Sequence, residues 1–343
     1  MQASGYDQTK PKSSQQVLIP RVCALSRPVL VTGAAGFIGS HLNDRLLDRG
    51  LHVMGFDNLS SGDMANLSHA MENSRFRFVR GDLLDFQATA HMLGECELVF
   101  HLAADSEARV GAENPDIHFK KNLQATMNLL EAMRKRGART KLVFASTSTI
   151  YGEPSVIPTP EDYGPLLPIS AYGATKLGCE ALAASYTRLL PLQVVIFRFA
   201  NVVGSRARHG VLYDFIMKLR KDPLWLEVLG EGTQTKSYLH VDDCVDAFLM
   251  ALDDRFWRNS VEVYNIGSED QTNVLKIANI IIEAMGLNNV TIRTTGGRAW
   301  PGDVIMMQLD ISKIKRHGWR AGRNSEEAVR SAAEQLIREL WIK

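Results

Sequence analysis

The sequence predicts an α/β protein built on a doubly wound parallel sheet, followed by a smaller α/β domain that binds substrate. Two observations support this fold class. Short apolar segments alternate with stretches of helical periodicity, and several of these segments are apolar on both faces, as strands covered by helices on both sides are. A glycine-rich turn also joins the first apolar segment to a helical pattern.

This first strand, turn and helix predict a nucleotide site. An apolar run leads to Gly33, Gly36 and Gly39, and a helical pattern continues to Arg49. Such glycines permit the turn, let a pyrophosphate approach the backbone and let the helix pack on the strand. The next strand ends in Asp57, whose carboxylate can accept hydrogen bonds from ribose hydroxyls and would repel a 2′-phosphate. We therefore expect a Rossmann domain that binds NAD.

Later elements divide the chain. Further strands are expected at 76–79, 98–101, 141–145 and 194–197, and beyond about Val202 the elements become shorter, with frequent Gly and Pro. We expect a flexible N-terminal tail at residues 1–27, an NAD-binding domain at 28–200, and a mainly substrate-binding domain at 201–343. Some segments of that last part are expected to return to the first domain.

Composition excludes several classes of partner. Lys and Arg number 39 against 38 Asp and Glu, so the net charge of +1 indicates neither a nucleic-acid nor a membrane surface. The four cysteines are scattered, which predicts buried thiols in a reducing compartment and no metal site. The apolar Val17-Leu18-Ile19 is too short for the core of a signal peptide, so we expect a cytoplasmic protein.

The pair Tyr172 and Lys176 is the first candidate for catalysis. Four residues apart in a helical pattern, the two side chains share one face. An ammonium beside a phenol lowers the pKa of the phenol, so Tyr172 is expected to accept a proton near neutral pH. Two solvated residues on a surface helix are the alternative for this spacing alone.

A longer series of motifs carries a family resemblance. The chain contains, in order, Thr32-Gly33-Ala34-Ala35-Gly36-Phe37-Ile38-Gly39, Phe56-Asp57-Asn58-Leu59-Ser60-Ser61-Gly62, Gly81-Asp82-Leu83, His101-Leu102-Ala103-Ala104, Asn122, Phe144 to Gly152, Tyr172-Gly173-Ala174-Thr175-Lys176 and Arg198 to Gly204. Over residues 28 to about 320 this resembles the extended short-chain dehydrogenases/reductases, in the nucleotide-sugar epimerase and dehydratase branch typified by UDP-glucose 4-epimerases.

The resemblance implies an NAD site made by residues from several strand ends. Asp82 as a plain turn former and Leu102 as plain core remain the alternatives. The implied cofactor-binding residues are Gly33, Gly36, Phe37, Ile38, Gly39, Asp57, Asn58, Ser60, Gly62, Asp82, Leu83, Leu102, Ala103, Ala104, Asn122, Tyr172 and Lys176.

Within the branch, the residues after Thr147 favour epimerisation. The resemblance implies that Thr147 hydrogen-bonds the sugar 4-hydroxyl. The 4,6-dehydratases follow this threonine with Asp-Glu, and UDP-glucuronate decarboxylases place a glutamate in the stretch, whereas this chain has Ser148 and Thr149. Without carboxyl groups at these two positions, elimination of water lacks its proton donor and its proton acceptor. Dehydratase and decarboxylase are thus the alternative enzymes, and an NAD-sensing binding protein on the same fold is the non-enzymatic one.

The implied mechanism assigns Thr147, Tyr172 and Lys176 as catalytic residues. Tyr172, as phenolate, removes the sugar O4 proton directly or through Thr147 while C4 gives a hydride to NAD. The 4-keto sugar then rotates and is reduced on its other face, so NAD is regenerated in each turnover. Lys176 is expected to hold the nicotinamide ribose and to keep Tyr172 ionised.

Substrate recognition is the least determined part. The resemblance implies a UDP-sugar bound by Arg109, Thr147, Ser148, Thr149, Tyr172, Asn201, Arg208, Lys236, Arg298 and Asp303. Lys236 stands where epimerases usually have arginine, and Arg298 is shifted by two residues from the family position. Arg109 and Arg208 stand where UDP-glucuronate epimerases place site arginines, so neutral hexose and uronate both remain open. A homodimer is expected, with 114–135 and 177–190 as candidate interface helices; intramolecular packing of these helices is the alternative.

Overall fold

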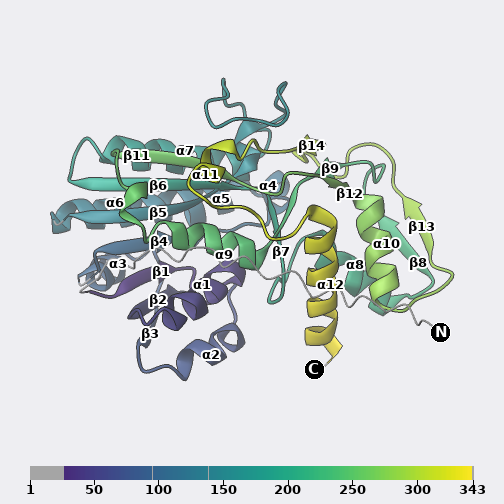
Figure 1. The fold of residues 1–343 in the computed structure, drawn as a ribbon, viewed down its shortest axis with the longest axis horizontal. Coiled ribbons are helices and arrows are strands. Elements are labelled where there is room, and N and C mark those ends of the chain that lie inside the picture. The colour runs from purple at the N-terminus through teal and green to yellow at the C-terminus, as the bar shows by residue number, and fades with distance from the viewer. Residues whose placement is uncertain (1–26, 95, 138, 342–343) are drawn as a thin grey trace, which may run out of the picture.

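A seven-stranded parallel sheet forms the centre of the computed structural model, which describes residues 27–94, 96–137 and 139–341 (Figure 1). The expected tail, residues 1–27, lies outside these ranges except for Arg27. The strand order is β11-β6-β5-β4-β1-β2-β3, the order of a doubly wound sheet. Its strands are β1 (Val29–Thr32), β2 (Val53–Asp57), β3 (Phe76–Arg80), β4 (Leu98–His101), β5 (Thr140–Thr147), β6 (Leu192–Phe199) and β11 (Val261–Ile266).

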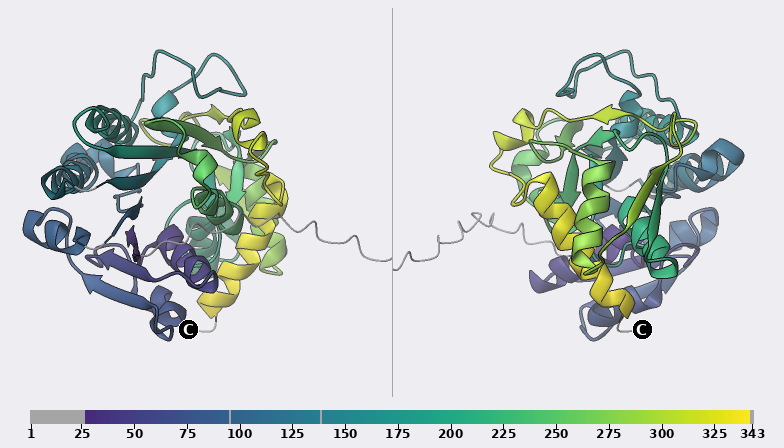
Figure 2. Two further views of the ribbon diagram at one scale, coloured as in Figure 1. Left: turned by 60° about the vertical axis from the view of Figure 1, so that its left-hand side comes forward. Right: turned by 90° about the vertical axis from the view of Figure 1, so that its right-hand side faces the viewer.

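Helices cover both faces of this sheet, which confirms the predicted fold class (Figure 2). Because alternate side chains of a strand point to opposite faces, Val29 and Val31 of β1 pack in the core beneath α1 (Phe37–Asp48) and α9 (Val241–Met250). Leu30 packs in the core on the other face, whose helices are α3 (Phe86–Leu93), α6 (Ala125–Arg136) and α7 (Ala171–Tyr186). Two elements from the second half of the chain, α9 and β11, thus belong to this layered unit.

The remaining elements pack beside the carboxyl ends of the strands, on the right in Figure 1. Three helices enclose a separate apolar core, and three small sheets flank them. The helices are α8 (Val211–Lys221), α10 (Val274–Ala284) and α12 (Ser325–Trp341), and the strand pairs are β7 (Asn201–Val203) with β10 (Tyr238–His240) and β8 (Trp225–Val228) with β13 (Thr291–Thr294). The third sheet contains β12 (Thr272–Asn273), β9 (Thr235–Lys236) and β14 (Met306–Met307).

Short helical segments complete the chain and modify one expectation. The helix expected over 114–135 consists of α5 (Pro115–His118), a π-helical segment (Phe119–Gln124) and α6. The other short segments are η1 (Met64–Leu67), α2 (Ser68–Met71), α4 (Val110–Glu113), η3 (Ser148–Tyr151), η4 (Asp254–Phe256) and α11 (Ser312–Lys315). No helix in the described part of the chain is long and apolar enough to span a bilayer.

Candidate active site

The glycine turn after β1 forms a cradle that fits a pyrophosphate. Gly33 has φ of +70°, which L side chains rarely adopt, and a Cβ at Gly39 would lie 2.1 Å from the Gly33 carbonyl oxygen. Helix α1 therefore begins almost in contact with the end of β1. Gly36 occupies its N-cap without a side-chain hydrogen bond, so the first N–H groups, at Phe37 and Ile38, are left for an anionic ligand.

Asp57 lies beside this turn at the end of β2. Its carboxylate oxygens accept hydrogen bonds from the N–H groups of Ala35 (2.9 Å) and Leu59 (2.7 Å), and each oxygen keeps a further lone pair. Burial raises the pKa of Asp57, while these two hydrogen bonds act in the opposite direction. The carboxylate is thus fixed where ribose hydroxyls of a nucleotide on the turn would reach it.

Several of the predicted cofactor-binding residues beside Asp57 form a connected edge. The Asn58 amide donates to the Asp82 carboxylate at 2.9 Å, and its own oxygen accepts from the Ser60 N–H at 2.9 Å. Leu83 is buried behind Asp82. Gly62 packs so closely on the glycine turn that a Cβ there would lie 2.9 Å from Ala35. These residues fit the adenosine half of NAD.

A buried chain of hydrogen bonds orients the backbone after β4. The Thr126 hydroxyl donates its proton to the Asn122 carbonyl (2.7 Å), so toward His101 Nε2 (3.0 Å) the hydroxyl oxygen must be the acceptor. The proton of the neutral His101 ring is therefore on Nε2. His101 Nδ1 then accepts from the Thr32 hydroxyl (2.7 Å), whose oxygen accepts from the Ala103 N–H (3.3 Å). The segment Leu102, Ala103 and Ala104 is thereby tied to the end of β1, beside the cradle.

Asn122 is hydrogen-bonded to the loop that follows β4. Its side chain accepts from the Asp105 N–H at 2.7 Å and donates to the Asp105 carbonyl at 3.1 Å, and the residue is only 1% exposed. Asn122 therefore fixes the loop that follows β4. The π-helical turn places it there, which helical periodicity in the sequence does not reveal.

Helix α7 brings Tyr172 and Lys176 to the end of β5. Ser170 caps the helix by accepting from the Gly173 N–H at 3.1 Å. A Cβ at Gly173 would lie 2.8 Å from the Thr149 carbonyl oxygen, so only glycine lets the helix approach this turn so closely. Thr147 lies near enough to the Tyr172 phenol to act on its pKa, and the His118 ring lies edge-on to Tyr172, with centroids 5.6 Å apart.

The electrostatics of Tyr172 correct one expectation. Burial raises the pKa of Tyr172 to about 12, and the nearby Thr147 hydroxyl, which acts to lower that pKa, opposes this rise only in part. The Lys176 ammonium lies 4.1 Å from the centroid of the Phe144 ring, and burial lowers its own pKa to about 8. The prediction that Lys176 lowers the pKa of Tyr172 is therefore wrong for this structure, because the ammonium is directed at Phe144 and desolvation of the phenol dominates.

The turn after β5 carries three uncharged hydroxyls. Thr147 caps the short η3 helix, where its oxygen accepts from the Thr149 N–H at 3.2 Å and lies 3.1 Å from the Thr149 hydroxyl. Ser148 is 7% exposed, and Thr149 is partly exposed. None of the three can act as a carboxylic acid or a carboxylate base.

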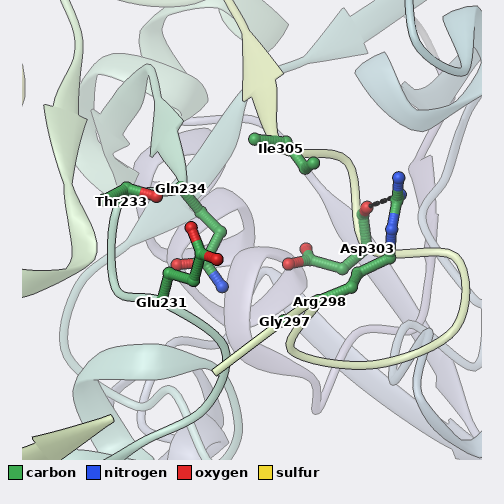
Figure 3. Close-up of a pocket in the computed structure, with 7 residues that line it drawn as sticks. All are labelled: Glu231, Thr233, Gln234, Gly297, Arg298, Asp303 and Ile305. Atoms are coloured by element: carbon green, nitrogen blue, oxygen red, sulfur yellow. Dashed lines mark hydrogen bonds between the residues drawn. The ribbon is translucent and has the colours of Figure 1, made fainter. Parts of the chain in front are cut away.

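Three predicted substrate residues meet on the second half of the chain. Lys236 Nζ lies 2.6 Å from an Asp303 carboxylate oxygen. Arg298 donates to the Asp303 carbonyl at 2.6 Å, as the dashed line in Figure 3 marks. Arg298 also pairs with Glu153 at 2.9 Å, which joins it to the loop after η3. A cavity of about 150 Å³ opens beside them, lined by Glu231, Thr233, Gln234, Gly297, Arg298, Asp303 and Ile305.

The other predicted arginines differ in their surroundings. Arg109 forms a two-pronged pair with Glu107, with distances of 3.0 and 3.3 Å, so its charge is already balanced. Arg208 is half-buried in the loop after β7. In that loop His209 lies 3.0 Å from the Ser106 hydroxyl, which joins it to the loop after β4. Asn201 begins β7 and donates weakly to the Ser237 carbonyl at 3.4 Å.

Several supporting residues were missed by sequence reasoning. Glu180 could have been found, because it follows Lys176 by one helical turn on the same face. Asn66, whose amide donates to the Ala35 carbonyl at 2.9 Å, carries no signal in the sequence, since it acts through a contact between distant segments. The roles of His101 and Arg198 within their motifs were likewise visible only in three dimensions.

Comparison with known proteins shows the family to which this chain belongs. A model of the NAD dependent epimerase/dehydratase family matches residues 29–267. A putative UDP-glucose 4-epimerase of Methanocaldococcus jannaschii is 34% identical over 321 residues, covering 92% of this chain and 98% of the relative.

Solved structures agree with this match. A UDP-galactose 4-epimerase is 44% identical, with a TM-score of 0.82 over 92% of this chain and 100% of that chain. The UDP-glucuronic acid 4-epimerase from Bacillus cereus, in complex with UDP-glucuronic acid and NAD, is 30% identical, with a TM-score of 0.83 over 91% of this chain and 99% of that chain. The chain therefore belongs to the NAD-dependent epimerase/dehydratase family of enzymes, and its cofactor is NAD.

Proposed function

We propose that this protein is an NAD-dependent UDP-sugar 4-epimerase, which inverts C4 of a UDP-hexose or UDP-hexuronate through a 4-keto intermediate. One observation carries the proposal. Tyr172 stands on α7 beside the turn that begins at Thr147, whose hydroxyl acts on the Tyr172 pKa, and the next two side chains of that turn, Ser148 and Thr149, are uncharged. The site can thus move the proton of a sugar hydroxyl but has no carboxyl group in this turn to expel water.

In this proposal, one set of residues transfers the proton and another binds the cofactor. Thr147 holds the sugar 4-hydroxyl against Tyr172, which takes its proton and later returns it. Lys176 supplies positive charge beside the nicotinamide ribose, and the turn of Gly33 to Gly39 with Asp57 holds the rest of the cofactor. NAD, when bound, accepts the C4 hydride and gives it back to the opposite face of the sugar.

The substrate's diphosphate is assigned to Lys236, Arg298 and Asn201, with Asp303 orienting the two cations. Asp303 holds the Lys236 ammonium in place. Unlike an arginine guanidinium, this ammonium is a single point charge and cannot bind a phosphate with two parallel hydrogen bonds. For a uronate carboxylate, Arg208 is the better candidate, because the Arg109 guanidinium is already paired with Glu107. Neutral hexose and uronate substrates both fit this assignment.

The test is conversion of four sugars by purified protein without added oxidant. UDP-glucose, UDP-galactose, UDP-glucuronate and UDP-galacturonate are each incubated, and C4 stereochemistry is followed by proton NMR. We expect interconversion of one pair, which also identifies the substrate. No conversion of any of the four would rule out a UDP-sugar 4-epimerase, whereas a 4-keto-6-deoxy or pentose product would identify a dehydratase or a decarboxylase.

A further inference from the structure

A buried ion pair lies directly behind the residues proposed to act on the sugar. The Glu180 carboxylate on α7 and the Arg198 guanidinium on β6 are 2.7 Å apart at their closest atoms, with two further contacts of 3.1 and 3.2 Å. Their side chains are only 6% and 7% exposed. Removing both ions from water is costly, so such a pair often contributes little net stability. Its position points to another task.

The pair holds both ends of the turn that carries Thr147. At the start of the turn, the hydroxyl of Ser146 donates to Glu180. At its end, Arg198 donates to the Tyr151 hydroxyl at 2.8 Å, and Tyr151 in turn donates to Asn265 at 2.7 Å. One ion pair thus fixes residues 146–151 from both ends.

The same carboxylate also belongs to the helix that carries the other two catalytic groups. Glu180 follows Lys176 by four residues on α7, on the same helical face. Its negative charge acts to raise the pKa of Lys176, against the burial that lowers that pKa to about 8. Without this charge, the ammonium would lose more of its protonation near neutral pH.

The other groups around Lys176 do not replace this charge. On α7 its neighbours are Tyr172, whose pKa is raised, and Cys179, whose thiolate would also raise the pKa of Lys176. Burial raises the pKa of the Cys179 thiol, so both groups are neutral at pH 7. On β4, His101 is neutral because burial lowers its pKa to about 3. The sheet beneath adds the Phe144 ring of β5 and the positive Arg198 of β6. Glu180 is therefore the carboxylate that balances Lys176.

We propose that Glu180, paired with Arg198, is a positioning residue for the reaction: it clamps the Thr147–Tyr151 turn against α7 and places a negative charge one helical turn from Lys176. This inference rests on the proposed function for the roles of Thr147 and Lys176. It makes Glu180 more than a structural residue, because its loss should change the titration of Lys176 as well as the stability of the fold.

The first experiment is Glu180→Gln, read by two independent measurements. Lysine carrying ¹³C at Cε is incorporated, and the Lys176 resonance, assigned with Lys176→Arg, is titrated by NMR. We expect its midpoint to fall by about one pH unit or more relative to wild type. In the conversion assay, the alkaline limb of kcat should move to lower pH by the same amount, and kcat at pH 8.5 should fall at least about tenfold while KM changes little.

Two further variants separate positioning from folding. Asp243→Asn removes a carboxylate that is 6% exposed on the distant helix α9, and it should lower stability without moving the Lys176 titration. Glu180→Gln combined with Arg198→Gln removes both charges and leaves no ion unpaired. This double variant should fold, as checked by circular dichroism, and its Lys176 midpoint should also lie below that of wild type.

The outcomes are decisive in each direction. An unchanged Lys176 midpoint in a folded variant overturns the proposal, and so does failure of both Glu180 variants to fold, since the pair would then serve stability alone. Absence of sugar conversion by the wild-type protein would contradict the proposed function instead. The NMR titration would still report on Glu180 in that case.

Discussion

At the scale of single residues, Tyr172 combines a catalytic position with an unfavourable resting environment. Burial raises its pKa to about 12, so ionising it near pH 8 costs on the order of 5 kcal/mol before any help from its surroundings. Positive charge brought within about 4–6 Å lowers such a pKa by about 1–3 units. Because the Thr147 hydroxyl also acts on the Tyr172 phenol, the two hydroxyls are placed to pass a proton between the substrate and Tyr172. Catalysis should therefore depend on both hydroxyls.

Substitutions at these two positions should have graded effects. Tyr172→Phe removes the proton acceptor and should lower kcat by about 10²- to 10⁴-fold. Thr147→Val removes the relay with little change in volume and should lower kcat less, whereas Thr147→Ser keeps the hydroxyl and should stay within about tenfold of wild type. Steady-state kinetics in the conversion assay measure all three. Bound NAD, quantified after denaturation of the protein, should remain near wild type in each; full activity of Tyr172→Phe would contradict its role as base.

His101 gives a second prediction at this scale, concerning stability. Its pKa is about 3 in the folded protein against 6.5 for an unperturbed histidine, so the unfolded state binds the proton more tightly. The stabilisation is complete above about pH 6.5 and is lost as the pH falls toward 3. Between pH 7 and pH 5 we expect His101 to remove about 2 kcal/mol from the free energy of unfolding.

Urea unfolding of wild type and His101→Asn at the two pH values measures this loss. The variant should be less stable at pH 7, because it breaks the chain from Thr32 to Thr126, but its stability should fall less on acidification. His52→Gln, at an exposed position, serves as control and should retain the wild-type pH dependence. Equal pH dependence in wild type and His101→Asn would show that His101 is not the titrating group.

At the scale of elements, the site depends on two helices that approach strand ends unusually closely. Helix α1 begins against the end of β1, and α7 begins against the turn after β5. In each case a glycine stands where a Cβ would collide with a backbone carbonyl. The first approach forms the cofactor cradle, and the second brings Tyr172 to Thr147. The same substitution at the two glycines should consequently affect different steps.

Gly39→Ala places a Cβ 2.1 Å from the Gly33 carbonyl oxygen, so α1 must shift and NAD binding should be lost. Gly173→Ala places one 2.8 Å from the Thr149 carbonyl oxygen, so kcat should fall by about tenfold or more while NAD remains bound. NAD content and kcat are measured for both. Gly164→Ala, where a Cβ meets nothing within 4 Å, is the control. Loss of NAD in Gly173→Ala and not in Gly39→Ala would contradict the assignment of Gly39 to cofactor binding and of Gly173 to the catalytic step.

At the scale of the whole molecule, the sequence predicted the features that depend on local pattern and on order along the chain. The strands expected at 98–101 and 141–145 are β4 and β5, and the glycine turn with Asp57 lies at the adjoining ends of β1 and β2. The pKa of Tyr172 and the ion pair of Glu180 were not predictable, because they depend on burial and on contacts between distant segments. The break at Phe119–Gln124 escaped prediction because the hydrogen bonds of Asn122 are tertiary.

The expected homodimer remains a prediction, and the surface of α6 and α7 is the candidate interface. These helices pack together on one face of the sheet, and Phe119, the first residue of the π-helical segment that precedes α6, is 52% exposed. Leu123, Met127 and Leu182 are only partly buried in the core beneath. An exposed aromatic ring beside half-buried apolar side chains is a typical centre for a two-fold interface.

Light scattering coupled to size-exclusion chromatography tests this assembly. Wild type should show about twice the chain mass of 38.1 kDa. Phe119→Glu would bury a charge at the interface and should give the single-chain mass, with the fold intact by circular dichroism. Leu224→Glu changes a side chain that is 67% exposed beside β8, away from these helices, and should leave the mass at that of wild type. The glycine turn and Asp57, which are assigned to NAD, lie together in this chain, so a monomeric Phe119→Glu protein should also keep its bound NAD. If Phe119→Glu remains dimeric, or if Leu224→Glu dissociates instead, the interface lies elsewhere and the assignment to α6 and α7 is wrong.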